Sequence, residues 1–168
     1  MKKIKLFLFP LLAITLVFSS CEQQDLSLTY IEPIQDWGKS PQEIIEKMAK
    51  SKTNATLEYS EKDDASYYMV YENYGISESV EYIFENNRLI FCSTLTTFSY
   101  KQIVKDFFDS KFTLVQIEKN DDYDAYLYHN KKKTSSILLI IHDGGVSTYY
   151  IPYIKGDIED FETALEYI

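Results

Sequence analysis

The sequence predicts an α+β fold of two tandem units, each a helix followed by four antiparallel strands. The helices are expected on one sheet face, and a C-terminal helix should follow the second unit. The segment Ser40-Pro-Gln-Glu-Ile-Ile-Glu-Lys-Met48 resembles Ser99-Tyr-Lys-Gln-Ile-Val-Lys-Asp-Phe107 at an offset of 59 residues, and later matches settle at 57. Each of these segments is followed by runs rich in Tyr, Val, Ile and Thr. We therefore interpret the chain as an internal duplication.

Residues 1–20 have the pattern of a targeting segment rather than of a folded element. Lys2, Lys3 and Lys5 precede an apolar run at 6–18, and small residues follow at 19–20. The apolar run is shorter than the roughly 20 residues that a membrane-spanning helix needs. We expect residues 1–20 to be removed as a signal peptide and residues 21–36 to act as a tether. An ordinary secretory signal, cut nearby, is the alternative.

The end of this segment, Phe18-Ser-Ser-Cys21, resembles the bacterial lipobox, with Phe18 at a position where leucine is usual. The resemblance implies that Cys21 is lipidated, becomes the mature N-terminus and holds the chain on a membrane of the cell envelope. The outer membrane is favoured, and the periplasmic or surface side stays open. Glu22 and Asp25 resemble the acidic signals that send Bacteroidota lipoproteins to the cell surface. Lipidation would leave Cys92 as the one free thiol, so no intramolecular disulfide is expected, and its apolar run predicts a buried side chain.

The composition is acidic but contains enough apolar residues for a core. Without residues 1–20 the chain keeps 14 basic and 26 acidic residues, a net charge of −12. This charge argues against nucleic acid as a partner, because phosphates would be repelled. Apolar residues make up 45% of the chain, so we expect one folded domain from residue 37 to residue 168.

Two capping signals mark the starts of the first two helices, in units at residues 37–98 and 99–154. Ser40 is expected to cap the first helix, with Pro41 at its first position and Glu43 completing a capping box. Ser99 and Gln102 are expected to do the same for the second helix. Residues 155–168 should hold the C-terminal helix, from about residue 157. The apolar stripes are Ile44, Ile45 and Met48 in the first helix, Ile103, Val104, Phe107 and Phe108 in the second, and Phe161, Ala164, Leu165 and Ile168 in the third.

The strands of the first unit are expected at 56–61, 66–73, 79–85 and 88–98, and those of the second at the shifted numbers. Asn86-Asn87 and Asp143-Gly144 can adopt the positive φ angles of two-residue hairpin turns. These turns set the register of the face that the helices should cover, with Phe84 opposite Leu89, Tyr82 opposite Phe91, Ile141 opposite Val146, and Leu139 opposite Thr148.

The opposite sheet face differs between the units. The first unit places Glu81, Ile83, Glu85, Arg88, Ile90 and Cys92 there, with Glu85 and Arg88 as an expected ion pair. The second unit places Leu138, Ile140, His142, Ser147, Tyr149 and Ile151 there, which is too apolar to face water. Either the C-terminal helix or a partner should cover it. The candidate binding face is Glu81, Ile83, Glu85, Ile90, Leu138, Ile140, His142 and Tyr149.

The sequence predicts no catalytic residue, metal site or cofactor. It contains no glycine-rich phosphate loop and no metal-ligand spacing. His129 and His142 align with Glu72 and Glu85, which indicates exposed positions rather than ligands. The acidic run at 121–124 and the basic run at 131–133 are interpreted as hairpin turns, although the basic run could contact anionic lipid or an acidic partner. The fifteen tyrosines suit a binding surface, because tyrosine offers contact area at low entropic cost, but tyrosine also favours strands.

The pattern Trp37-Gly-x-Ser40-x-x-Glu-Ile-x-x-x-Met48 behind a lipobox resembles a group of small Bacteroidota lipoproteins that mostly lack an assigned activity. The duplicated plan is similar to beta-lactamase inhibitor protein and to small outer-membrane assembly lipoproteins, and more distantly to the saddle of TATA-binding protein. This resemblance implies a sheet face that grips another protein. We expect a lipid-anchored envelope protein, not an enzyme, that binds a protein or polymer such as a glycan through its sheet face or hairpin tips. The alternatives are an enzyme or enzyme subunit acting on envelope glycans, with Glu81 and Glu85 as paired carboxylates, and an immunity-type or inhibitor lipoprotein.

Overall fold

The computed structural model describes residues 29–63, 65–153, 158 and 160–166. The expected signal peptide, Cys21 and the tether up to residue 28 lie outside the described residues. The elements are α1 (Pro41–Lys50), β1 (Thr56–Lys62), β2 (Ser66–Tyr74), β3 (Ser77–Glu85), β4 (Arg88–Thr96), the 3-10 helix η2 (Phe98–Tyr100), α2 (Lys101–Lys111), β5 (Thr113–Lys119), β6 (Tyr123–His129), β7 (Ser135–His142), β8 (Gly145–Pro152) and α3 (Phe161–Leu165).

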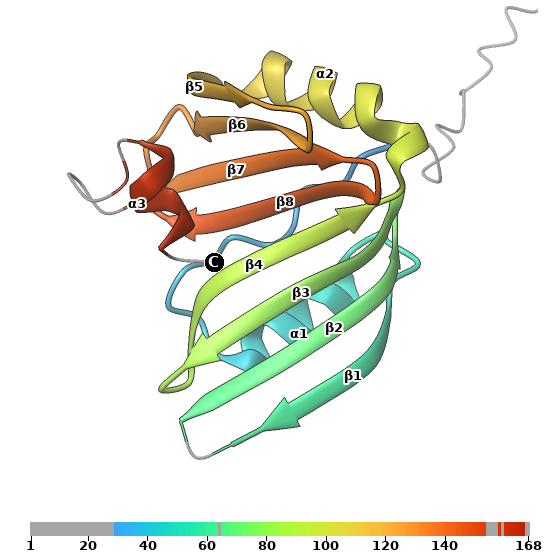
Figure 1. Ribbon diagram of the computed structural model, residues 1–168. Helices are drawn as coiled ribbons and strands as arrows, with labels where there is room; N and C mark the ends of the chain where they lie inside the picture. Colours follow the sequence, from blue (N-terminus) through green and yellow to red (C-terminus); the bar gives the residue numbers. More distant parts are fainter. Residues whose placement is uncertain (1–28, 64, 154–157, 159, 167–168) are drawn as a thin grey trace, which may run out of the picture.

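The strands form one antiparallel sheet of eight strands, in the order β1-β2-β3-β4-β8-β7-β6-β5 (Figure 1). The predicted fold class, two tandem helix-plus-four-strand units, is therefore wrong. The seam between the halves is a strand pair, in which Cys92–Thr96 of β4 run against Val146–Tyr150 of β8. A separate four-stranded unit would leave β4 or β8 as an open edge with unpaired backbone groups. Their pairing satisfies those groups and leaves only β1 and β5 as edges.

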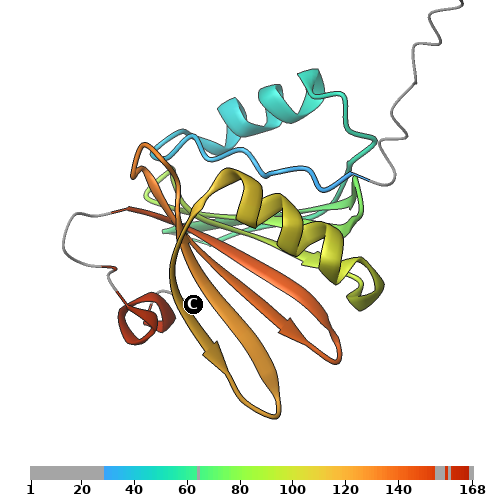
Figure 2. The ribbon, with the colours of Figure 1, turned by 90° about the horizontal axis from the view of Figure 1, so that it is seen from above.

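The sheet has two different faces, which we name by what covers them. The inner face carries α1, α2 and the extended segment 29–37, and the outer face carries α3 (Figure 2). The helix α3 lies on the face that the sequence left to either the C-terminal helix or a partner. The inner core is rich in aromatic rings and includes Ile44, Met48, Met69, Tyr82, Phe84, Leu89, Val104, Phe108, Tyr128, Leu139, Val146 and Tyr150.

The start of α1 agrees with the sequence prediction. The Ser40 hydroxyl accepts a hydrogen bond from the Glu43 backbone N–H at 3.4 Å, and the Glu43 carboxylate accepts one from the Ser40 N–H at 2.9 Å. Pro41 occupies the first helical position. The predicted capping box is confirmed, and it directs the apolar side of α1 onto the inner face.

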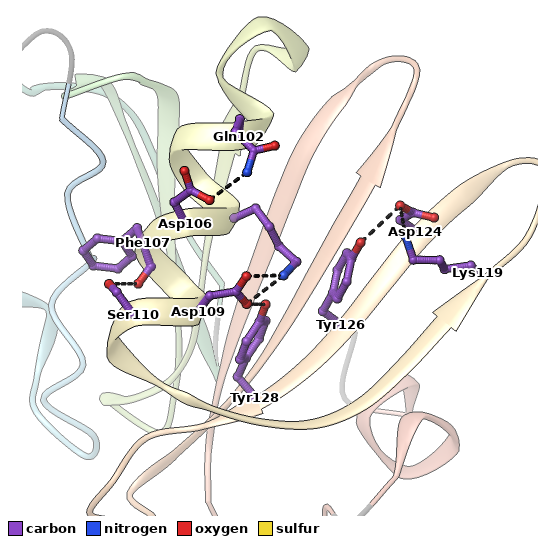
Figure 3. Close-up of polar contacts among 10 residues, drawn as sticks. Gln102, Asp106, Phe107, Asp109, Ser110, Lys119, Asp124, Tyr126 and Tyr128 are labelled. Atoms are coloured by element: carbon purple, nitrogen blue, oxygen red, sulfur yellow. Dashed lines mark hydrogen bonds and ion pairs between the residues drawn. The ribbon is translucent and has the colours of Figure 1, made fainter.

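The predicted cap of α2 is wrong. Ser99 lies inside η2, and Tyr100 stands at the N-cap without a side-chain hydrogen bond to the helix. The Gln102 amide donates to Asp106 at 2.7 Å instead of reaching back (Figure 3). The chain enters α2 through a 3-10 turn, so Ser99 lacks the extended backbone that an N-cap serine needs.

The β3–β4 hairpin shows where the predicted register fails. Asn86 and Asn87 have φ angles of 48° and 64°, and Phe84 pairs with Leu89 as predicted. A bulge then makes Ile90 an extra residue, so that Phe91 pairs with Ile83. Because one extra residue reverses the side chains beyond it, Phe91 moves to the outer face and Cys92 to the inner core. The pairs predicted for β7 and β8, Ile141 with Val146 and Leu139 with Thr148, are confirmed.

The segment 29–37 crosses the inner face and ties both halves of the sheet together. The Tyr30 hydroxyl lies within hydrogen-bonding distance of Thr94 in β4 and of Thr148 and Tyr150 in β8, at 3.1, 2.9 and 2.8 Å. The Trp37 indole N–H donates to the Ser135 hydroxyl at 3.0 Å. The end of the expected tether is therefore part of the core.

A short helix, α3, covers the half of the outer face formed by β6, β7 and β8. Its Phe161 and Ala164, with Ile158, lie on Leu138 and its apolar neighbours, which are Ala125, Leu127 and Ile151. The Asp160 side chain caps α3 by accepting from the Thr163 N–H at 2.9 Å. The chain thus covers its most apolar outer surface, as the sequence suggested for residues 157–168, of which 157, 159, 167 and 168 lie outside the described residues.

Candidate functional site

The other half of the outer face has no helix over it in the described part of the chain. Figure 1 looks onto this face, with α3 in front of β7 and β8 and with α1 behind the sheet. We call this surface the open face. Strand pairing places the following side chains on it: Tyr59, Tyr68, Val70, Glu81, Ile83, Phe91, Ser93, Leu95 and Tyr149.

The open face is rich in apolar and aromatic side chains. Tyr59 is 47% exposed and Leu95 is 39% exposed, whereas the other apolar members are half-buried. Tyr59 and Tyr68 meet edge to face with ring centroids 6.1 Å apart, and Phe91 and Tyr149 also lie 6.1 Å apart. An uncovered surface of this kind is typical of a protein-binding or ligand-binding region.

Only part of the predicted binding face comes together here. Glu81, Ile83 and Tyr149 lie on the open face, whereas Leu138 is fully buried beneath α3 and cannot contact a partner. Ile140 packs against the α3 cluster, and so do Phe91 and Tyr149, which border it on the open face. The other predicted residues lie at ends or irregular positions: Ile90 is the bulge residue, Glu85 stands beside the β3–β4 turn, and His142 stands at the end of β7.

The predicted ion pair between Glu85 and Arg88 is not present. The two residues are register partners, but no ion pair joins them in the described residues.

The predicted binding face left out Tyr59, Tyr68, Phe91 and Leu95. Side chains alternate between the two faces of a strand, so the sequence could show which residues share a face with Tyr59 or Tyr68 within each strand. Only the pairing of β1 with β2 and of β2 with β3 places both tyrosines on the face of Glu81. Phe91 was assigned to the inner face because a bulge leaves no clear mark in a sequence.

Glu81 lies near the middle of the open face and has a fixed position. Its carboxylate accepts a hydrogen bond from the Ser93 hydroxyl at 2.9 Å, across the β3–β4 pair. Partial burial, together with the nearby Glu81 carboxylate, raises the pKa of Tyr68 to about 12. Within the described residues Glu81 forms no ion pair. An oriented carboxylate among aromatic rings therefore has no cation beside it.

A second polar cluster joins α2 to β6 on the inner side (Figure 3). Lys105 binds both carboxylate oxygens of Asp109 at 2.7 and 2.5 Å, and Tyr128 donates to Asp109 at 2.7 Å. Burial raises the pKa of Asp109, but the hydrogen bonds from Lys105 and Tyr128 outweigh it and leave that pKa below its usual value. Nearby, Lys119 pairs with Asp124, which holds the pKa of the lysine at about 12. The charged groups of this cluster are therefore paired with one another.

The histidines do not form a metal site. The described residues contain no group of three metal-ligating side chains. His129 is nearly buried and its Nε2 lies 3.1 Å from the Ile158 carbonyl oxygen, so its predicted exposure is wrong. His142 is half-buried and its Nδ1 accepts from the Gly144 N–H at 3.1 Å. Cys92 is buried, and burial raises the pKa of its thiol well above the usual value, so it is poorly suited to act as a nucleophile.

Two shallow depressions lie away from the open face. One, of about 440 Å³, lies between the start of α1 and the turns that follow β1 and β3, next to Ile45 and Tyr67. The other, of about 500 Å³, lies beside Lys111, Lys131 and Lys132, and Glu32 in it forms an ion pair with Lys111. The first is also lined by Asp63 and Ser66, and the second by Ser110.

No protein-family model, curated protein or solved structure matches this chain. In the described part of the chain, no helix is both long enough and apolar enough to span a membrane.

Proposed function

We propose that the protein is a lipid-anchored, non-enzymatic component of the bacterial cell envelope that binds a protein partner through the open face. The pattern of residues 1–21 supports the anchor, with Cys21 as the acylated residue. The single observation that carries the binding role is the contrast between the two halves of the outer face. One half is closed by α3, whereas the other keeps aromatic and aliphatic side chains in contact with solvent.

The geometry favours a position close to the membrane. Tyr30 is held in the core, nine positions after Cys21. A fully extended chain of that length spans at most about 30 Å. An acylated Cys21 would therefore keep the sheet near the bilayer, where partners are other envelope proteins.

The alternative of a glycan-active enzyme finds less support. Glu81 and Glu85 both lie on β3, four residues apart, so their Cα atoms are separated by about 13 Å at the usual rise of a strand. The carboxyl groups would have to lean toward each other to reach the about 5 to 9.5 Å of retaining and inverting glycosidases, whereas that of Glu81 is held on the Ser93 hydroxyl of β4. An immunity or inhibitor role is compatible with the proposal, because it differs only in the identity of the bound protein.

Site-specific photocrosslinking of the full chain in intact cells tests the binding role. A photoreactive residue at Leu95 reports on the open face, and one at Ile103 in α2 is a matched control because their exposures are 39% and 41%. We expect a defined crosslinked protein from position 95 and none from position 103. Equal labelling from both positions, or none from position 95, would contradict the proposal.

Mass spectrometry of the mature chain tests the anchor. We expect a diacylglyceryl-modified Cys21 at the N-terminus and loss of membrane association in the Cys21→Ser variant. Recovery of an unmodified chain cut at another bond would show that the segment is an ordinary secretory signal.

A further inference from the structure

The open face has the charge and ring chemistry of a receptor for cations. We propose that its partner presents a cationic segment, whose lysine or arginine side chains meet Glu81 and the aromatic rings around it. This inference rests on the proposed function and specifies the chemistry of the partner.

Glu81 is the first step of the argument. Its carboxylate is oriented by Ser93, and within the described residues no lysine or arginine pairs with it. Tyr68 of β2 lies opposite Ile83, which is two residues from Glu81 on the same face of β3. Tyr149 of β8 lies opposite Ser93, which is itself the register partner of Glu81. The two rings therefore lie on either side of Glu81. A carboxylate between aromatic rings attracts a cation by direct charge and by cation–π contact.

The chain already holds one of its own cations in this way. The Lys105 ammonium group binds Asp109 and lies 4.4 Å from the ring centroid of Tyr126 and 6.0 Å from that of Tyr128. Figure 3 shows Asp109 and both tyrosines of this arrangement. The open face offers the same groups, a carboxylate and aromatic rings, but no described lysine pairs with its carboxylate.

The other charged residues on the outer face of β1 to β4 also favour a cationic partner. Strand pairing puts Glu61, Glu72 and Glu85 on the outer face with Glu81, and Arg88 beside the β3–β4 turn is the one basic residue paired on that side of the described strands. A second copy docked face to face would bring these carboxylates together, which costs energy. A cationic partner would gain attraction from all of them.

Fluorescence anisotropy with labelled peptides on the full chain in non-ionic detergent tests this inference. We expect a peptide of alternating Arg-Gly to bind, while Ser-Gly and Glu-Gly peptides and an N-acetylglucosamine oligosaccharide do not. Glu81→Gln should weaken Arg-Gly binding at least about tenfold, because it removes the charge that the arginine would meet. Glu46→Gln removes the same charge from the exposed side of α1 and should change binding less than about twofold.

A second pair of variants guards against an effect of misfolding. Leu95→Arg adds a cation to the open face and should weaken Arg-Gly binding, whereas Ile103→Arg adds the same charge on α2 at similar exposure and should not. All four variants should unfold at nearly the temperature of the unchanged protein.

Three results would overturn the inference: no Arg-Gly binding, equal losses within either matched pair, or equally tight binding of a neutral or acidic probe. A neutral or acidic protein crosslinked at position 95 would also overturn it while leaving the proposed function intact. Absence of any crosslink at position 95 would instead remove the proposed function itself.

Discussion

Tyr30 is the residue at which the N-terminal segment and both halves of the sheet meet. Its hydroxyl lies within 3.1 Å of three other hydroxyl oxygens, and Thr94 and Thr148 lie 2.5 Å from each other. Burial raises the pKa of Tyr30 to about 12, so the ring is neutral and acts only through hydrogen bonds. A buried polar network of this kind stabilises the fold only while its members stay paired.

Replacing Tyr30 by phenylalanine should therefore destabilise the protein. Tyr30→Phe keeps the ring against Phe107 and Phe108 but leaves Thr94, Thr148 and Tyr150 with fewer partners. We expect a loss of about 1 to 3 kcal/mol in the free energy of unfolding, measured by denaturant titration.

Tyr59→Phe is the control for this substitution, because its hydroxyl bonds only the exposed Glu61 carboxylate, and it should cost less than about 0.5 kcal/mol. Equal losses in the two variants would show that the Tyr30 hydroxyl contributes little.

At the scale of single elements, α1 shows how a local signal determines structure and sets a pH dependence. Hydrogen bonds from Lys39 and from the Ser40 backbone and hydroxyl lower the pKa of Glu43 from 4.5 to about 2. Because the folded pKa lies below the ordinary value, Glu43 contributes stability above about pH 4.5 and loses it as the pH falls toward 2.

The Glu43→Gln variant should show this window directly. We expect the difference in unfolding free energy between the unchanged protein and the variant to be largest above pH 4.5 and to shrink as the pH falls toward 2. Denaturant titrations at several pH values measure it, and the other carboxylates cancel because both proteins contain them. A difference that stays constant across this range would contradict the role assigned to the Glu43 charge.

Elements set by neighbouring residues could be predicted from the sequence, and those set by distant residues could not. The α1 cap and the turn at Asn86 and Asn87 depend on a few adjacent side chains, and the structure has both. The cap predicted at Ser99 failed because Ser99 lies inside the 3-10 helix that leads into α2. The bulge at Ile90 depends on strand pairing, which no local pattern specifies. The burial of Leu138 depends on α3, which the sequence offered only as one of two possible covers. The candidate site was therefore found only in part.

At the scale of the whole molecule, the β4–β8 pair joins two groups of four strands into one sheet. The hydrophobic core on the inner face is continuous across this seam, since Tyr30, Cys92 and Tyr150 belong to a single core cluster. The outer face is divided instead, with α3 over β6 to β8 and the open face over β1 to β4 and Tyr149 of β8. The division leaves a solvent-exposed surface on one side of a sheet that α1 and α2 cover on the other side.

One sheet implies that neither half is stable alone. In a chain that ends at Phe98, β4 would lose its pairing with Val146–Tyr150, and Tyr30 would lose two of its three hydroxyl partners. We expect this fragment to show no cooperative denaturant transition by circular dichroism and to self-associate through the open β4 edge. The control is the full chain with a flexible Gly-Ser insertion after Thr97, which keeps both halves. It should stay folded at a cost of about 1 kcal/mol or less, because lengthening a loop costs little. A cooperative, monomeric transition in the fragment would mean that the first half is an independent unit and that the seam is not required for folding.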